Sequence, residues 1–385
     1  MIKVLFISQW YPHRYDPMLG LFVQKHAEAV SLYCKVKVLY VHADENIRTF
    51  EMEEKVHFNM SELIVYYPYL GKNILYKVAK PINYIRAYWI GYKHISQQGF
   101  TPDIVHANIL TRTAFIAYLL KLWKGIPYII SEHWSRYLLN RNTFNGTLRK
   151  ILTRLVVRNA KAILPVSESL KEAMLTHKLT NENYIVIYNV VDNFFFHENP
   201  IIVHHLKKRI INVSCFDEQA KNIKGIIRAC HELSKLRQDF EVILIGTGAD
   251  FEDVKEYSDS LNFPTGIINF LGEKTSKEVA NWMHNSDFFV LFSNFETAGV
   301  VISESLACGK PVLCTRVGIA PECINDKNGI LISTNDENEL LKKMNYLLDH
   351  FQDYDSTMIK KESMDKFNYS HIGAKITKIY ENSIL

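Results

Sequence analysis

Two acidic residues stand eight positions apart in a mostly apolar stretch. Residues 293–314 have the sequence SNFETAGVVISESLACGKPVLC, with Glu296 before Gly299 and Glu304 after it. If a helix begins just after the glycine, the free N–H groups of its first turn suit a phosphate. Glu304 would then lie about one turn into the helix, where it could accept hydrogen bonds from a pair of ribose hydroxyls. Glu296, in the loop, would face whatever group lies beyond the phosphates. The simpler alternative is a loop acid and a solvated helix acid.

The elements around these acids follow a repeating pattern. The run DFFVLFS before them is typical of a buried parallel strand, while Gly309 ends the following helix and Pro311 opens the next strand. Similar runs alternate with amphipathic stretches along the chain. They are IKVLFIS, KVKVLYVH, DIVHAN, PYIISEH, AILPVS and YIVIYN in the first half, then RIINVSC, FEVILIG, GIINFLG, DFFVLFS and KPVLCT. This pattern predicts an α/β protein whose parallel sheets are covered by helices on both faces.

The alternation is interrupted once, which predicts two domains. We expect an N-terminal Rossmann-like domain at 1–190, a linker at 191–208 and a C-terminal Rossmann-like domain at 209–365. A closing helix at about 366–385 is expected to pack back on the first domain. Ligands of such sheets bind beyond the carboxyl ends of the strands, so the sequence predicts a cleft between the two domains.

Composition excludes several classes of protein. The 385 residues are 48% hydrophobic and 22% charged with a net charge of +4, which is typical of a globular protein and gives no general nucleic-acid prediction. No run approaches 18 uninterrupted apolar residues, and the N-terminus has no signal-peptide pattern. The six cysteines are scattered without metal-ligand spacing. We therefore expect a cytoplasmic protein with reduced thiols.

The segment FETAGVVISESLACGKPVLCTRVGIAPECI resembles the signature of retaining glycosyltransferases of family 4, or group 1. That family has the GT-B fold, in which two Rossmann-like domains face a central cleft and two glutamates grip a nucleotide-diphosphate sugar. The resemblance implies a retaining transfer without metal or other cofactor, from a UDP-sugar or alternatively a GDP-sugar. The implied acceptor is a glycan or lipid-linked glycan, in bacterial capsule, lipopolysaccharide or exopolysaccharide synthesis.

The resemblance also implies roles for individual residues. Glu296 would hold the transferred sugar, Lys221 in SCFDEQAKNI would neutralise the diphosphate, and His133 in SEHWS would face the donor sugar. On their own, this lysine and histidine are compatible with a surface lysine and a structural histidine. The remaining donor-binding positions are Gly20, Asn189, Ser214, Gly246, Gly272, Glu273, Thr297, Ala298, Gly299, Val300, Val301 and Glu304.

The chain departs from the family pattern at three points. Cys215 stands where many members have an arginine, Ile319 replaces a glycine, and Thr297-Ala298 replaces Gly-Phe. Loss of a second cation should weaken stabilisation of the leaving diphosphate unless other groups compensate. The alternatives are thus a catalytically impaired sugar-nucleotide-binding protein, or an epimerase or phosphorylase on the same fold. A dehydrogenase would need NAD, but GTGAD at Gly246 lacks the third glycine of that motif.

Other motifs give weaker hypotheses. DYD at Asp353–Asp355 has the Asp-x-Asp form of metal-dependent transferases, but it lies in polar sequence after a helix, so no metal is expected. His106 in DIVHAN is a weak candidate site residue. Residues 71–94 and 148–161 interleave lysines and arginines with aromatic or apolar residues. They predict either contact with an anionic membrane surface or ordinary solvated helix faces.

Overall fold

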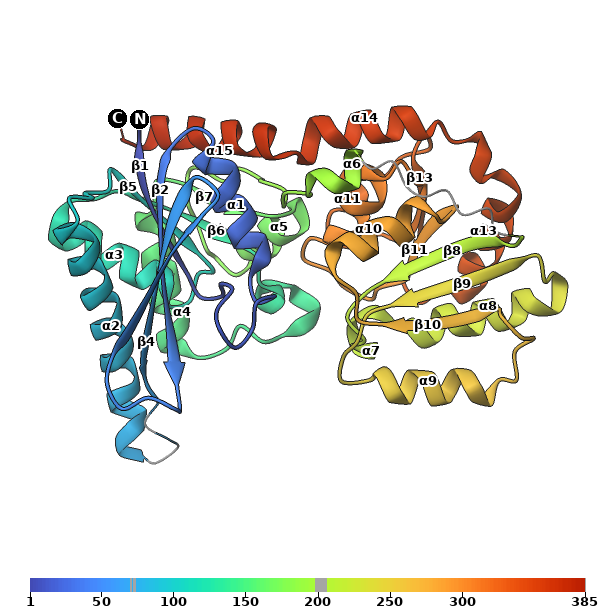
Figure 1. Cartoon of the computed structure of the whole chain (residues 1–385), viewed down its shortest axis with the longest axis horizontal. Coiled ribbons are helices and arrows are strands. Elements are labelled where there is room, and N and C mark those ends of the chain that lie inside the picture. Colours follow the sequence, from blue (N-terminus) through green and yellow to red (C-terminus); the bar gives the residue numbers. More distant parts are fainter. Residues whose placement is uncertain (70, 72–73, 198–205, 385) are drawn as a thin grey trace. The chain divides into compact units, whose positions relative to one another are not determined.

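The computed structural model describes residues 1–69, 71, 74–197 and 206–384, which divide into two compact units (Figure 1). The first unit contains Met1–Val166, Leu170–Val190 and Tyr369–Leu385, and the second contains Ser167–Ser169 and Val191–Asn368. Each unit has its own sheet of mainly parallel strands, so the predicted fold class of two parallel-sheet α/β domains is confirmed.

The first unit is built on a sheet of seven strands among the described residues, in the order β3-β4-β2-β1-β5-β6-β7. All neighbours are parallel except β3 and β4. The strands are β1 (Lys3–Ser8), β2 (Lys35–Asp44), β3 (Glu51–His57), β4 (Met60–Pro68), β5 (Ile104–Asn108), β6 (Tyr128–Glu132) and β7 (Ile163–Pro165). The helices are α1 (Leu21–Ser31), α2 (Ile74–Gln97), α3 (Thr113–Lys124), α4 (Thr147–Asn159), α5 (Glu168–Thr176) and α15 (Tyr369–Ile384), with short 3-10 turns at Ser135–Tyr137 and Leu139–Arg141.

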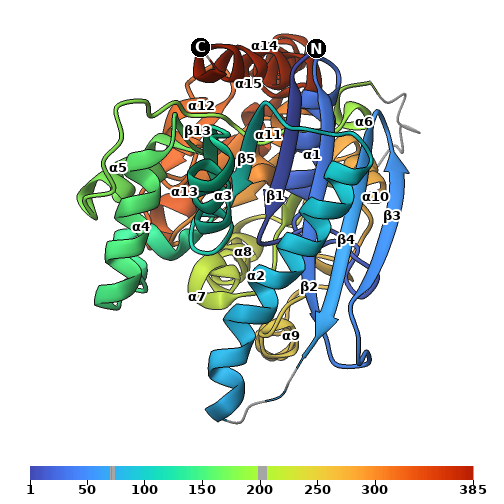
Figure 2. The same ribbon diagram turned by 90° about the vertical axis from the view of Figure 1, so that its left-hand side faces the viewer.

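Helices cover both faces of this sheet. Helices α1 and α15 pack together on one face, where α15 also contacts β5, while α2 and α3 pack on the other face and α4 packs against α3. Figure 2 shows α2, α3 and α4 in front of the sheet. Because both faces are buried, a central strand such as β1 is apolar at consecutive positions, with Val4, Leu5, Phe6 and Ile7 fully buried.

The second unit has six strands among the described residues, all parallel, in the order β10-β9-β8-β11-β12-β13. They are β8 (Lys208–Val213), β9 (Phe240–Ile245), β10 (Ile268–Gly272), β11 (Phe288–Leu291), β12 (Val312–Thr315) and β13 (Gly329–Ile332). Its helices are α6 (Asn193–His197), α7 (Glu218–Lys221), α8 (Ile223–Leu236), α9 (Phe251–Ser260), α10 (Ser276–His284), α11 (Val300–Ala307), α12 (Ala320–Cys323), α13 (Glu337–His350) and α14 (Ser356–Phe367), with a 3-10 turn at Phe351–Asp353.

One predicted strand is wrong. The segment YIVIYN at 184–189 forms only an isolated bridge between Tyr184 and Ile163. The N–H groups of Ile185 and Ile187 donate to the carbonyls of Ile163 and Pro165, but Pro165 has no N–H with which to continue the ladder. The segment therefore lies beside β7 without forming a strand.

Other strands were not foreseen from the sequence. In the β3–β4 hairpin, β3 was missed because it is an edge strand whose side chains are almost all exposed, so it lacks an apolar pattern. Strand β4 was missed although most of its side chains are buried. Strand β13 was also missed, although β11 and β12, which have four residues as well, were predicted. Within the predicted linker at 191–208, residues 193–197 form helix α6 and β8 begins at Lys208. The middle of that segment, 198–205, lies outside the described residues.

Candidate functional site

The loop that follows β11 leads directly into helix α11. Gly299 is the N-cap of this helix and has φ 69°, a left-handed conformation that side-chain-bearing residues rarely adopt. The chain can therefore turn sharply, and the first N–H groups of α11, beginning at Val300 and Val301, have no partners within the helix. Glu304 is half-buried on the same helix. The predicted strand, loop and helix around the two glutamates are confirmed as local structure.

Glu296 is held by two side chains from different parts of the second unit. Its Oε1 atom forms an ion pair with Lys221 Nζ and accepts a hydrogen bond of 2.9 Å from Ser293 Oγ. The Glu296 side chain is 9% exposed and that of Lys221 is 17% exposed. An ion pair with this little exposure is screened less by water than a surface pair. The tertiary structure thus joins two residues that the sequence singled out separately.

Asn294 fixes the two loops that carry this ion pair. Its N–H donates to the carbonyl of Ala220 at 2.8 Å, and its Nδ2 donates to the carbonyl of Gln219 at 2.9 Å. Both acceptors belong to α7, which ends at Lys221. Since β8 and β11 are neighbouring parallel strands, their following loops meet at the same edge of the sheet. The Asn294 contacts therefore set the position of the lysine relative to the acid.

Gly318 lies against the other side of Glu296 and was not predicted to matter. It has φ 58°, and a Cβ atom at this position would lie 2.7 Å from Glu296 Cβ and 3.1 Å from the Ala298 carbonyl oxygen. The next residue, Ile319, donates its N–H to that carbonyl at 3.2 Å and is 2% exposed. Ile319, which stands where the family pattern has a glycine, is therefore a buried apolar residue. The VGIA sequence gave the only hint of this contact.

The other predicted donor-binding residues of this unit lie along the same edge of the sheet. Ser214 follows β8, Gly246 follows β9 and Gly272 ends β10. A Cβ atom on Gly246 would lie 1.9 Å from the Ser214 carbonyl oxygen, and the Gly246 N–H donates to the Gly272 carbonyl at 2.9 Å. Glu273 is exposed just beyond. Thr297 accepts a 2.7 Å hydrogen bond at its carbonyl from Ser167 Oγ. The strand order thus brings these residues to one edge.

His133, in the first unit, has an unusual environment for a histidine. It is 7% exposed, and its ring centroid lies 4.5 Å from that of Phe22 and 5.5 Å from that of His26. Burial lowers its pKa well below the ordinary value, and a hydrogen-bonding interaction with the Asn189 side chain opposes this change. The ring is therefore neutral and lies beside the Asn189 amide.

Two other N-terminal positions have structural explanations. Gly20, the N-cap of α1, has φ 69°, and a Cβ atom there would lie 2.4 Å from the Trp10 carbonyl oxygen. His106 contacts Tyr380 Oη at 2.6 Å through Nδ1 and Ser131 Oγ at 2.7 Å through Nε2. The glycine is required by a close approach of two chain segments, and this histidine is a satisfied core residue.

Glu132 was missed, although it stands next to His133 in the quoted SEHWS segment. It is fully buried, and its carboxylate accepts hydrogen bonds of 2.8 Å from the N–H groups of Leu110, His133 and Trp134. Burial raises its pKa from the ordinary 4.5 to about 7, although these three bonds act in the opposite direction. The carboxyl group therefore fixes the backbone of His133, and its protonation changes near neutral pH.

Comparisons with known proteins agree with this architecture. The family model for glycosyl transferases group 1 matches residues 198–362, and the model for Glycosyltransferase Family 4 matches residues 31–193. An uncharacterized glycosyltransferase of Methanocaldococcus jannaschii is 29% identical over 99% of this chain and 98% of its own length. The matched residues include every strand of the two sheets except β1. The chain is a family 4 glycosyltransferase of the GT-B fold.

Two further matches give relatives of known specificity or structure. A Campylobacter jejuni enzyme is 26% identical over 67% of this chain and 70% of its own. It is named N-acetylgalactosamine-N,N'-diacetylbacillosaminyl-diphospho-undecaprenol 4-alpha-N-acetylgalactosaminyltransferase. The crystal structure of Anabaena HepE in complex with UDP and glucose has a TM-score of 0.74 and 16% identity, covering 99% of this chain and all of that one. At this identity the HepE match supports the fold alone.

The departure at Cys215 places a neutral group near the catalytic candidates of this glycosyltransferase. Its side chain is exposed just after β8. Partial desolvation by the surrounding protein raises the pKa of the thiol, while the positive charge of Lys221 lowers it. A thiol with a raised pKa is neutral near pH 7 and does not replace the charge of an arginine. Lys221 and the first turn of α11 remain as groups that can stabilise a diphosphate.

Metal-binding side chains do not gather in the described part of this glycosyltransferase. Within it, no group of three or more His, Cys, Asp or Glu side chains is arranged to hold an ion. In the DYD segment, Asp355 caps α14 by accepting from the N–H groups of Thr357 and Met358, and Asp353 contacts His350 Nδ1 at 2.9 Å. Both carboxylates of this segment thus have structural partners.

Proposed function

We propose that this glycosyltransferase moves a sugar, with retention of anomeric configuration and without a metal, from a nucleotide-diphosphate sugar to a lipid-linked glycan. The observation that carries the proposal is the Lys221–Glu296 ion pair beside Gly299 and the start of α11. An acid for the sugar, a cation for the diphosphate and free N–H groups lie on adjacent loops of one unit. A UDP-sugar is the preferred donor, with a GDP-sugar as the alternative.

The proposed chemistry uses the charge of this ion pair. The bond between the anomeric carbon and the diphosphate oxygen breaks, the acceptor oxygen bonds to that carbon on the same face, and the acceptor proton passes to the departing diphosphate. Lys221 and the N-terminus of α11 stabilise the negative charge that develops on the leaving group. Glu296, held in place by Lys221 and Ser293, hydrogen-bonds the transferred sugar. The buried, neutral ring of His133 is proposed to hydrogen-bond the donor sugar.

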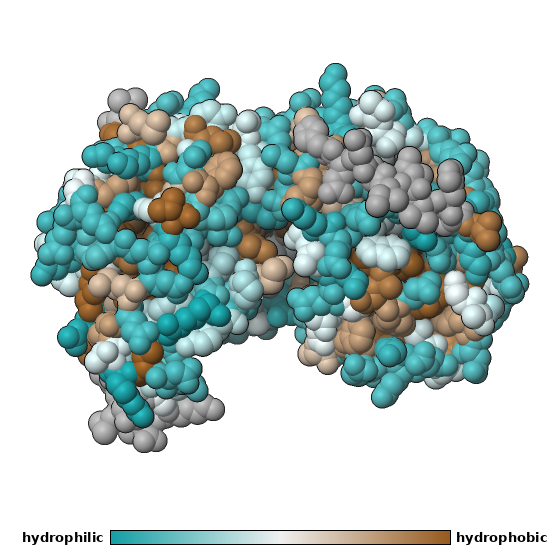
Figure 3. Space-filling view, in the orientation of Figure 1, coloured by the Kyte–Doolittle hydropathy of each residue, from teal (hydrophilic) through white to brown (hydrophobic). Residues whose placement is uncertain are grey.

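The proposed acceptor is supported by the surface of the first unit. Between residues 63 and 167 the chain has fifteen lysines and arginines but only two acids, Asp103 and Glu132, although its overall net charge is only +4. Helices α2, α3 and α4 contain no acid. They expose large apolar side chains, including Trp89, Leu122, Trp123, Leu148 and Ile151. Brown residues beside α2 are visible at the left margin of Figure 3. Such a surface suits an anionic bilayer.

None of the helices in the described residues combines the length and apolar character needed to cross a bilayer. We propose that the protein associates peripherally with the cytoplasmic face of the membrane through the cations and exposed apolar side chains of α2, α3 and α4. The name of the C. jejuni relative contains a diphospho-undecaprenol acceptor, which supports a lipid-linked acceptor here. The proposed role is in bacterial surface polysaccharide synthesis.

The donor site is tested by thermal unfolding with UDP, GDP, ADP or NAD in the presence of EDTA. A ligand that binds only the native state at a hundred times its Kd stabilises it by about 2.7 kcal/mol. We expect one nucleoside diphosphate to raise the Tm of the wild type and to have less effect on Lys221→Ala. Stabilisation by NAD alone, or by none of the four, would contradict the proposal. With the matching sugar nucleotide, NMR of the product then determines whether the anomeric configuration is retained.

Membrane association is tested separately by sedimentation with vesicles that contain anionic lipid. Each cation at an anionic surface contributes about 1 kcal/mol, so Arg149→Glu combined with Arg154→Glu should weaken binding more than tenfold. The matched control is Lys255→Glu combined with Lys361→Glu, at exposed positions of the second unit. Equal loss in both double variants, or binding that ignores lipid charge, would remove this part of the proposal.

One alternative has a specific observation in its favour. Because Cys215 leaves Lys221 without the second cation common in the family, the protein could bind a sugar nucleotide without transferring the sugar. Such a protein would show the same thermal stabilisation but no turnover with any acceptor. Conversion of the donor sugar into an epimer in the absence of any acceptor would instead indicate an epimerase.

A further inference from the structure

The first unit contains an apolar groove that the donor site does not use. Two cavities of about 440 and 370 Å³ lie against helices α2 and α3, and both are lined by Ile85 and Ile116. Because they share these two residues, the cavities are adjacent, and we refer to them together as the groove. From Lys80 to Trp89 on α2, a rise of 1.5 Å per residue gives the groove a length of roughly 14 Å. Neither cavity is lined by an acidic residue.

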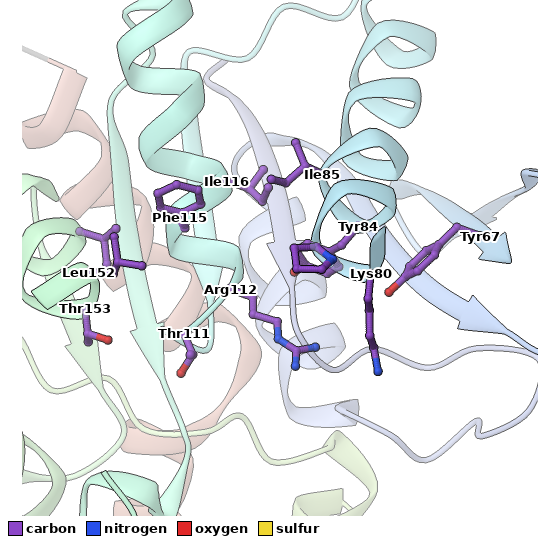
Figure 4. A pocket seen from close by; sticks show the side chains of 12 residues that line it. Tyr67, Lys80, Tyr84, Ile85, Thr111, Arg112, Phe115, Ile116, Leu152 and Thr153 are labelled. Atoms are coloured by element: carbon purple, nitrogen blue, oxygen red, sulfur yellow. The ribbon is translucent and has the colours of Figure 1, made fainter. Parts of the chain in front are cut away.

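One end of this groove is polar and positively charged. Tyr67, near the end of β4, lies there together with Lys80 and with Arg112, the N-cap of α3. Figure 4 shows the Lys80 and Arg112 side chains extending to the same side of the cavity, with the Tyr67 hydroxyl nearby. Among the described residues, neither cation forms an ion pair. This end is therefore suited to an anion, and the partial positive charge at the start of α3 adds to it.

A buried hydroxyl lines the same cavity. The Tyr84 hydroxyl interacts with that of Tyr88, and the positive charge of Arg112 acts on it as well. A hydroxyl can donate one hydrogen bond and accept two, so it can also contact a ligand oxygen in the cavity. Together with the two cations, this hydroxyl makes this end of the groove polar.

The other end of the groove opens onto the exposed apolar surface. The rings of Trp89 on α2 and Trp123 on α3 have centroids 4.4 Å apart, and these residues are 46% and 52% exposed. Leu122, which also lines this cavity, is 65% exposed. Lys124 Nζ lies 3.6 Å from the centroid of the Trp123 ring. Exposed tryptophans beside a lysine are typical of positions at a membrane–water interface.

We propose that this groove binds the hydrocarbon chain of a phosphorylated lipid acceptor, with the phosphate or diphosphate held by Lys80, Arg112 and the Tyr84 hydroxyl. The apolar walls formed by Ile85, Ile116 and their neighbours favour a hydrocarbon chain over a polar glycan. The chain enters beside the two tryptophans, where the surface would contact lipid. The proposal rests on the proposed function, because it supplies the binding site for the lipid part of that acceptor.

The test is isothermal titration with farnesyl diphosphate, using the whole protein in saturating UDP so that the donor site is occupied. Farnesol and inorganic diphosphate provide the tail and the head group separately. We expect farnesyl diphosphate to bind at least tenfold more tightly than either part. Arg112→Gln and Ile85→Glu should each weaken this binding at least tenfold. The matched controls Arg158→Gln and Ile82→Glu, on exposed residues that do not line the groove, should have less than a twofold effect.

Several outcomes would overturn the proposal. Equal affinity for inorganic diphosphate and farnesyl diphosphate would mean that the cations bind a free anion only. The groove would be excluded as a lipid site if Ile85→Glu bound farnesyl diphosphate as tightly as the wild type does. The same would follow if the wild type did not bind farnesyl diphosphate at all. If Ile85→Glu converted a dimer to a monomer without affecting lipid binding, the occupant would be a second copy of this chain. Thermal stabilisation of every variant by UDP, measured in parallel, shows that the variants are folded and bind the nucleotide. A loss of lipid binding can then be distinguished from failure of the proposed function.

Discussion

Lys221 and Glu296, separated by 75 residues in the sequence, form an ion pair between the loops that follow β8 and β11. Ser293 also donates to the carboxylate, and Asn294 fixes both loops through the backbone of α7. The catalytic proposal depends on this relationship, since it keeps a carboxylate and an ammonium group together beside the N-terminus of α11.

Lys221→Ala should lower turnover more than tenfold, because it removes a positive charge from the site at which the leaving group becomes negative. The comparison is Lys224→Ala, which removes a lysine three residues later whose Nζ pairs with the exposed Asp253 at 2.7 Å. That control should keep more than half of wild-type turnover. Steady-state assays with the donor identified by thermal unfolding measure both. Similar rates in the two variants would be evidence against the site.

Gly318→Ala should reduce activity by displacing Glu296, since the new Cβ would lie 2.7 Å from Glu296 Cβ. Gly266→Ala is the control, because Gly266 also has a positive φ, 75°, but the nearest atom to its added Cβ would be the flexible end of Lys207 at 3.9 Å. Each substitution should cost about 1 kcal/mol of stability from the left-handed backbone. Only Gly318→Ala should also lose most of its turnover. Equal activity in both variants would show that the Glu296 position tolerates the displacement.

Glu132 should make stability depend on pH. Its pKa is about 7 in the folded protein and 4.5 ordinarily, so the folded state binds more protons between these values. The free energy of unfolding should therefore fall as pH rises from about 4.5 to 7, by about 3 kcal/mol in total, and then stay level. Urea unfolding at pH 5 and pH 8 measures this change. Glu132→Gln should lack this contribution, and an identical pH dependence in both proteins would contradict the assignment.

Cys215→Arg should strengthen binding of the nucleoside diphosphate that stabilises the wild type. An added cation near Lys221 should contribute about 1 kcal/mol, which corresponds to a roughly fivefold lower Kd. Cys215→Ser is the control, because it keeps the size and removes only the thiol, and its Kd should be unchanged. Titration calorimetry at two salt concentrations provides the measurement. If the arginine variant bound no more tightly, Lys221 and α11 would already supply the charge stabilisation that the site needs.

The sequence by itself determined the α/β class, most strands and the local structure around the two glutamates. Continuous apolar runs identify buried parallel strands because both faces of such sheets are covered, and Gly299 and Gly309 bound α11 by backbone conformations that glycine adopts at little cost. Two of its failures fall where this signal is absent or interrupted. Edge strand β3 is exposed, and Pro165 prevents 184–189 from extending the sheet.

Only the tertiary structure decided which distant residues meet. The ion pair between Lys221 and Glu296 exists because β8 is the neighbour of β11 in the sheet, and strand order is not encoded in local periodicity. The contact of Gly318 with Glu296 and the complete burial of Glu132 have the same origin. The groove between α2 and α3 depends on how two helices pack on one sheet face, which amphipathic patterns alone do not specify.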